Sequence, residues 1–109
     1  MFFNIANLQY NYESTVFGNG EILKKGVIVH IHDIYLPFDY PQFMCDRFFN
    51  EQYMLAAFIL ANPEKFKTIL PNYFISEEEE LAKIISPMWN HPNLTKVEKH
   101  GGSFWLQIN

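Results

Sequence analysis

The sequence is poor in cysteine, in basic residues and in long apolar runs. Cys45 is the only cysteine among 109 residues, so no internal disulfide can form and a reducing compartment is expected. Eight lysines and arginines stand against twelve acidic residues, giving a net charge of −4, and they are scattered along the chain. Nucleic-acid binding needs a basic stripe that neutralises phosphates, and its absence excludes that function.

The first residues have no basic stretch followed by a long apolar run. Neither a signal peptide nor a membrane span is therefore expected. Together with the lone cysteine, this predicts a cytoplasmic protein with no membrane partner. The acidic run at 77–80 is too short for an acidic tail, and it is typical of a helix start, where carboxylates meet the positive end of the helix dipole.

Hydrophobic residues are abundant, at 49% of the chain, and aromatic residues make up 17%. This composition indicates a packed core rather than disorder. The length suits one small domain over residues 1–109 and not two. A chain of this length buries a modest share of its surface, so a partner or a further segment is expected to contribute to its stability.

Apolar and β-branched runs predict the strands. The clearest is 27–31, apolar on both faces, as a central strand covered on each side by helices would be. Weaker strands are predicted at 2–6, 65–70 and 103–108, and Pro71 ends the strand at 65–70. The polar segment 11–20 reads as a loop or a frayed helix.

Apolar residues at spacings of three and four predict a helix over 46–61, which ends at Pro63. Ser76 and Glu79 match a capping box for a second helix over 77–85, with Pro87 as its stop. Between these elements, two prolines within 36–41 favour an extended aromatic loop. Residues 87–102 read as a loop. The pattern as a whole predicts the α/β class.

Ligands of open α/β sheets collect at the carboxyl ends of the strands. The strand 27–31 ends at His32 and Asp33, which makes this pair the first candidate site. His32 can bind a metal or transfer a proton near neutral pH, and Asp33 is a hard oxygen donor. A structural alternative is equally weighted, because Asp33 can cap the loop that follows. His30 lies two residues from His32 on the same face, and a buried, neutral, hydrogen-bonded histidine is the favoured interpretation there.

The aromatic loop offers candidate substrate contacts through Tyr35, Phe38 and Tyr40, with Phe43 nearby. Packing over the sheet edge explains these rings equally well. The polar residues of the helix start, Arg47, Asn50, Glu51 and Gln52, either face solvent, which is favoured, or bridge the helix to the loop. Nucleophile-elbow and phosphate-loop motifs are missing from the sequence. The Gly-Asn-Gly at 18–20 is a very weak match to a cofactor loop, because no helical pattern follows it.

Taken in order, four segments resemble the C-terminal half of bacterial class I S-adenosylmethionine-dependent methyltransferases. KGVIVHIHDI at 25–34 and LPFDYP at 36–41 resemble the fifth strand and following loop of that family. NEQYMLAAF at 50–58 resembles the next helix, and GSFWL at 102–106 the last strand, which runs antiparallel between its neighbours. The resemblance covers residues 20–108, and the ordered string is more specific than any single piece.

The resemblance implies a partial Rossmann-like methyltransferase sheet, mainly parallel with an antiparallel C-terminal strand and flanked by helices. It implies transfer of a methyl group from S-adenosylmethionine to a small-molecule or saccharide-like acceptor, with His32 and Asp33 in catalytic positions. In related metal-dependent O-methyltransferases an acidic pair after the fifth strand holds a divalent cation, and only Asp33 matches that pair here.

The family's glycine-rich turn and the acidic residue after the second strand have no counterpart in this sequence, so cofactor-binding residues are not assigned. We expect a fragment, a truncated product or one piece of a split protein, which binds S-adenosylmethionine weakly when alone. The alternatives are a non-enzymatic remnant that serves as an interaction or homo-oligomerisation module, supported by an open sheet edge, and, more weakly, a small metal-binding protein built on His30, His32 and Asp33.

Overall fold

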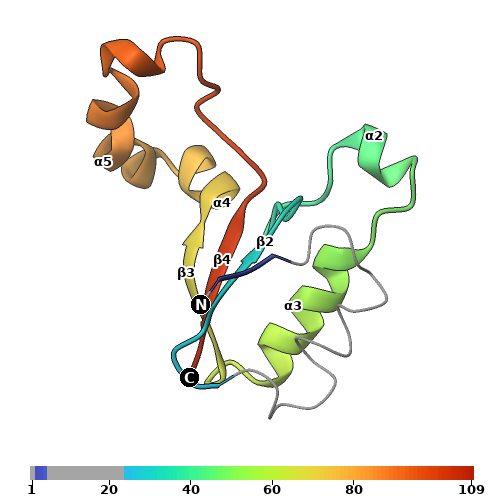
Figure 1. Ribbon diagram of the computed structural model, residues 1–109. Coiled ribbons are helices and arrows are strands. Elements are labelled where there is room, and N and C mark those ends of the chain that lie inside the picture. The colour runs from blue at the N-terminus through green and yellow to red at the C-terminus, as the bar shows by residue number, and fades with distance from the viewer. Residues whose placement is uncertain (1, 5–23) are drawn as a thin grey trace.

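A mixed four-stranded sheet forms the centre of the structure, a computed structural model that describes residues 2–4 and 24–109 (Figure 1). The strands lie in the order β1-β2-β4-β3. Their bounds are β1 Phe2–Asn4, β2 Ile28–Ile31, β3 Phe66–Pro71 and β4 Phe104–Ile108.

The prediction of a mainly parallel sheet is wrong. Only β1 and β2 pair in parallel, whereas β4 pairs antiparallel with both β2 and β3. The cause is the position of the last strand, because β4 inserts between β2 and β3 and turns both of its contacts antiparallel. The expected antiparallel orientation of this strand between its neighbours is present, but the sheet around it is mixed.

Strand β2 is interior, with β1 on one side and β4 on the other. Its buried residues alternate with half-buried ones, so Val29 and Ile31 point to one face and Ile28 and His30 to the other. Burial in β4 alternates in the same way. Among the described residues the sheet therefore has one core face, and the prediction of helices on both sides of β2 is not met by them.

Helix α3 (Glu51–Ala61) covers part of the core face (Figure 1). Its Leu55 is fully buried, and Met54, Phe58 and Ile59 pack against the same cluster. The buried cluster on the sheet side comprises Val27, Val29, Ile31, Ile34, Phe66, Phe104, Leu106 and Ile108. Each fully buried aliphatic or aromatic side chain of this kind contributes roughly 1.5–3 kcal/mol, so this face holds the sheet and the helix together.

The predicted helix over 46–61 starts later in the structure, because residues 46–50 are not helical. A short α2 (Gln42–Cys45) ends before a turn, and α3 begins only at Glu51. Phe48 has a φ of 60°, in the left-handed region that interrupts a right-handed helix. The apolar spacing of the segment is real, but the backbone reverses at Phe48, so the helix starts later than predicted.

The segment between β3 and β4 forms an arm of two helices, α4 (Asn72–Glu77) and α5 (Glu79–Trp89), that projects beyond the sheet (Figure 1). The predicted capping box is absent, because Ser76 lies inside α4 and its hydroxyl donates to the carbonyl of Tyr73 at 2.7 Å. The predicted stop at Pro87 is also wrong. Pro87 cannot donate to the carbonyl of Lys83, and the Ser86 hydroxyl donates to that carbonyl instead, at 2.9 Å.

The remaining connections carry little regular structure. A 3₁₀ turn at Pro92–Leu94 lies in the predicted loop before β4, and the His91 ring nitrogen accepts a hydrogen bond from the Asn93 N–H. Pro71 is the last residue of β3, as predicted. The segment 11–20 lies outside the described residues.

Candidate functional site

The carboxyl end of β2 carries the predicted pair. His32 and Asp33 are both exposed there, directly after the buried Ile31. Asp33 has a φ of 58°, a conformation that aspartate tolerates better than most residues. The chain turns sharply at this point, so Asp33 does take part in a turn, while its carboxylate remains on the surface.

Gly102 brings the start of β4 against this turn. The N–H of Ile34 donates to the carbonyl of Gly102 at 2.9 Å. A Cβ atom on Gly102 would lie 3.2 Å from the Cα of Asp33 and 3.3 Å from the ring of Tyr35. Such contacts are tighter than normal packing, so the absence of a side chain at Gly102 allows the two segments to meet.

Gln52 fixes the loop that follows. Its side chain is fully buried, at 0% exposure, inside the first turn of α3. The side-chain oxygen accepts from the N–H of Tyr35 at 2.9 Å, and the side-chain nitrogen donates to the carbonyl of Phe38 at 3.3 Å. Of the two interpretations for this residue, the bridge from helix to loop is the one observed, and the favoured solvent-facing interpretation is wrong for Gln52.

Tyr40 ties the same loop to the helix from the other side. Its hydroxyl accepts from the backbone N–H of Gln52 at 2.9 Å and donates to the carboxylate of Glu51 at 3.4 Å. Burial raises the pKa of Tyr40, and the neighbouring carboxylate adds to that effect. The ring is buried. In this arrangement Tyr40 supports the loop, while Tyr35 is half-buried and Phe38 is exposed.

Aromatic rings gather beside the tip of β2. Tyr35 meets the ring of Tyr73, from α4, edge to face at a centroid distance of 4.9 Å. Phe38 meets the same ring at 5.7 Å, and His100 lies 6.3 Å from it. Burial raises the pKa of the Tyr35 hydroxyl, and the charge of Asp33 raises it further. The hydroxyl is therefore a neutral hydrogen-bonding group at physiological pH.

His30 lies within β2, two residues before His32 at the tip, and its side chain is on the sheet face opposite the core. Its ring stacks on that of Trp105 at 4.2 Å and meets His32 edge to face at 4.4 Å. Burial lowers its pKa, and the neighbouring His32 lowers it further, so the ring is neutral at pH 7. The ring is half-buried, and its Nε2 atom has no hydrogen-bond partner within the described part of the chain. The expectation of a neutral histidine fits, whereas the expected hydrogen bond at Nε2 is absent there.

A metal centre is not assembled by these side chains. Among residues 2–4 and 24–109, no group of three His, Cys, Asp or Glu side chains is placed to hold an ion. His32 and Asp33 are adjacent, but within the described ranges a third ligand does not join them.

Sequence reasoning missed Tyr73 and His100, which join the tip from the arm and from the segment before β4. Neither has a local signal, because each reaches the site only through the return of the chain across the sheet. Gln52 had one partial signal, since it is a polar residue in the first turn of an otherwise apolar helix.

Comparison with protein-family models, with curated proteins and with solved structures gives no match. None of the helices in the described ranges has the length and apolar character needed to cross a membrane.

Proposed function

We propose that this chain forms the acceptor side of an S-adenosylmethionine-dependent methyltransferase whose cofactor-binding elements belong to another segment or polypeptide. The ordered string of segments across 25–34, 36–41, 50–58 and 102–106 supports this proposal. The place of β4, antiparallel between β2 and β3, agrees with what that resemblance implies for the last strand.

The tip of β2 carries the proposal. An interior strand presents a histidine and an aspartate to the surface, and a loop with three aromatic residues, Tyr35, Phe38 and Tyr40, follows at once. Gln52 and Gly102 hold that loop and that turn in place. Such rigid positioning of polar groups beside aromatic faces is what an acceptor site requires.

In the proposed reaction, the cofactor supplies the methyl group and the chain binds and deprotonates the acceptor. When bound, S-adenosylmethionine would supply an electrophilic methyl group, whose bond to the sulfonium sulfur breaks to leave the neutral thioether S-adenosylhomocysteine. Tyr35 and Phe38 contact the acceptor, a small hydroxylated molecule or a saccharide, and Asp33 accepts a hydrogen bond from it. His32 takes the proton that the acceptor hydroxyl loses when its oxygen gains the methyl group. Phe38 and Tyr35 also exclude water from one side of the acceptor.

No residue of the chain is assigned to S-adenosylmethionine, so the chain alone is expected to bind acceptors and not the cofactor. Calorimetric titration of the purified chain with S-adenosylmethionine should give no heat of binding. Ligand-observed NMR with a panel of phenols, polyols and saccharides should identify acceptors that bind the same sample.

Variants then assign the acceptor site. Tyr35→Ala and Asp33→Asn should abolish the NMR signal of an acceptor. His91→Ala, which replaces the exposed histidine that caps the 3₁₀ turn, should leave the signal unchanged. Transfer of labelled methyl groups is measured after the chain is mixed with the cofactor-binding half of a class I methyltransferase, and His32→Ala should remove it. Acceptor binding that survives both tip substitutions would refute the proposal.

A second candidate function is a non-enzymatic interaction module. The observation that favours it is the outer side of β1, which pairs with no further strand among the described residues. An open edge is a template for another strand. Acceptor binding separates the two candidates, because only the methyltransferase predicts it. For either candidate we propose a cytoplasmic location, which the single Cys45 supports.

A further inference from the structure

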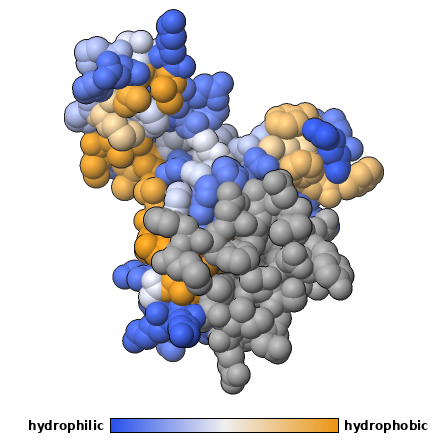
Figure 2. Space-filling view, in the orientation of Figure 1, coloured by the Kyte–Doolittle hydropathy of each residue, from blue (hydrophilic) through white to orange (hydrophobic). Residues whose placement is uncertain are grey.

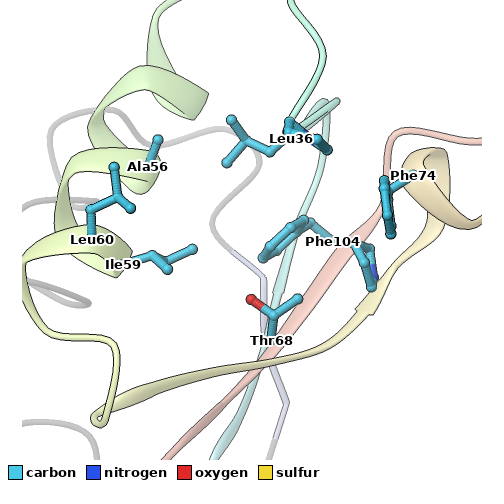
Figure 3. A pocket seen from close by; sticks show the side chains of 9 residues that line it. Leu36, Ala56, Ile59, Leu60, Thr68, Phe74 and Phe104 are labelled. Carbon is cyan, nitrogen blue, oxygen red and sulfur yellow. The ribbon is translucent and has the colours of Figure 1, made fainter.

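An open apolar groove lies on the core face of the sheet, beside α3 (Figure 3). It measures about 430 Å³, and its walls include Leu60 of α3, Phe74 of α4 and Phe104 of β4. Thr68 supplies the one polar side chain among the lining residues that the structure describes, and none of them is charged. The lining of the groove therefore gives no indication of which ligand or partner would fill it.

A second hollow, of about 400 Å³, lies in the arm, between α4, α5 and the segment 99–101 that leads into β4 (Figure 1). We call it the arm pocket. Helix α5 is amphipathic, and Ile85, Met88 and Trp89, at spacings of three and four, place one of its faces along this pocket. Leu70 of β3 adds to the apolar lining, and Figure 2 shows hydrophobic surface on the arm. Pockets for small molecules typically measure about 300–1,000 Å³, so the arm pocket is large enough for one.

The polar side chains that line the arm pocket carry no negative charge. Lys99 and His100 come from the segment before β4, and Asn72 and Ser76 come from α4. None of the described lining residues is an aspartate or a glutamate, although the chain as a whole has a net charge of −4. No ion pair joins Lys99 to another residue in the described ranges. The arm pocket thus combines apolar walls with a lysine ammonium that is available to an anion.

A smaller hollow of about 200 Å³ adjoins the arm pocket. The two hollows share the lining residues Ser76, Ile85, Trp89 and Lys99. Ser86 and Asn90 add polar side chains to the smaller hollow, and its described lining again contains no carboxylate. Lys99 therefore lies where an apolar chamber meets a more polar one, which is the position expected for the charged group of an amphipathic ligand.

We propose that the arm pocket binds a small apolar carboxylate. Its hydrocarbon or aromatic body packs against Met88 and Trp89 of α5, and its carboxylate pairs with the ammonium group of Lys99. A single lysine balances one negative charge, whereas a phosphate group carries about two and is commonly held by several donors. The site is separate from the acceptor contacts proposed above, because neither Asp33 nor Tyr35 lines it.

Heteronuclear NMR on the full chain, titrated with phenylacetate, tests this proposal. The indole N–H signal of Trp89 should shift until it saturates. The signal of Trp105, which lies on β4 outside the pocket, should stay in place. The neutral analogue phenylacetamide has nearly the same shape but no charge, so it should bind about three- to fivefold more weakly.

Two pairs of variants locate the ligand. Lys99→Gln should weaken phenylacetate binding by about the same three- to fivefold and leave phenylacetamide binding unchanged. Lys96→Gln, which replaces an exposed lysine outside the pocket, should change neither. Met88→Glu places a carboxylate in the pocket wall and should abolish phenylacetate binding. Ile84→Glu lies outside the pocket and should not, and both positions are exposed, so neither variant removes a buried contact.

A Trp89 signal that phenylacetate does not move would overturn the proposal. Equal affinities for phenylacetate and phenylacetamide would also overturn it, because the ligand would then not be recognised through its charge. The same conclusion follows if Lys99→Gln binds phenylacetate as tightly as the native chain, or if Met88→Glu still binds it.

Discussion

Gln52 offers the sharpest test of how the candidate site is held. We consider Gln52→Leu, which keeps a similar side-chain volume and removes both polar atoms. In the native chain the side chain is fully buried and joins the N–H of Tyr35 and the carbonyl of Phe38 to α3. The substitution leaves both backbone groups without their amide partner, in a position where water replaces it poorly.

The expected cost follows from those two bonds. Leaving a buried donor or acceptor unsatisfied costs about 1–3 kcal/mol per group, and the two losses lie in one network and need not add fully. We therefore expect Gln52→Leu to lower the free energy of unfolding by about 2–5 kcal/mol. This is a large share of the stability of an ordinary small domain, about 5–15 kcal/mol.

Urea unfolding followed by far-UV circular dichroism measures the change, provided that the slope of the transition stays constant. Gln42→Leu is the matched control, because the Gln42 amide makes one exposed hydrogen bond, to Asp46 at 2.8 Å. Its substitution should change the unfolding free energy by less than about 0.5 kcal/mol. If Gln52→Leu is as stable as the control, the loop is not held through this amide and the account of the site fails.

Three further predictions concern the backbone and the titrating groups. Gly102→Ala should destabilise by about 1–3 kcal/mol, because its methyl group would crowd a backbone atom, whereas Gly101→Ala, with nothing within 4 Å, should be tolerated in the same unfolding assay. His30 has a lowered pKa when folded, so the unfolded chain binds more protons below about pH 6.5. Stability should fall as the pH drops through that range, and His30→Phe should flatten the profile; an unchanged profile would contradict it. Phe48→Asn should stabilise by up to about 1 kcal/mol, because asparagine tolerates a positive φ and the ring is 87% exposed, while Phe43→Asn in helical α2 should not.

The strands were the most predictable part of the fold. β-branched and apolar runs placed β2, β3 and β4 within one or two residues of their observed bounds. The apolar pattern of a strand indicates that the strand is buried. The pattern does not indicate whether the neighbouring strands run parallel or antiparallel to it. The mixed pairing of the sheet depends on where β4 inserts, which is a property of the whole chain.

The helices show where local rules fail. Apolar spacing predicted a helix from residue 46, but α3 begins only at Glu51, after the left-handed turn at Phe48. An aromatic residue gives no sequence signal for that conformation, and the short α2 before the turn was not predicted. The stop assigned to Pro87 failed for a different reason. The hydroxyl of Ser86 satisfies the carbonyl that a proline leaves free, so α5 continues to Trp89.

The candidate site was also predictable only in part. Its exposed pair, His32 and Asp33, follows from one rule about the ends of buried strands, and both residues do lie at the tip of β2. The groups that complete the site come from distant parts of the chain, as with Tyr73 on α4. Residues that act through such contacts become predictable only once the topology is known.

The arm and the groove beside α3 have one physical origin. Because α4 and α5 occupy the connection between β3 and β4 and project beyond the sheet, neither helix lies over the strands that it joins. This one connection therefore accounts both for the open groove on the sheet and for the amphipathic helix α5, which lies outside that groove. Phe74 of the arm lines the groove, and Tyr73 beside it packs against Tyr35, so the position of the arm also affects the packing of the candidate site at the tip of β2.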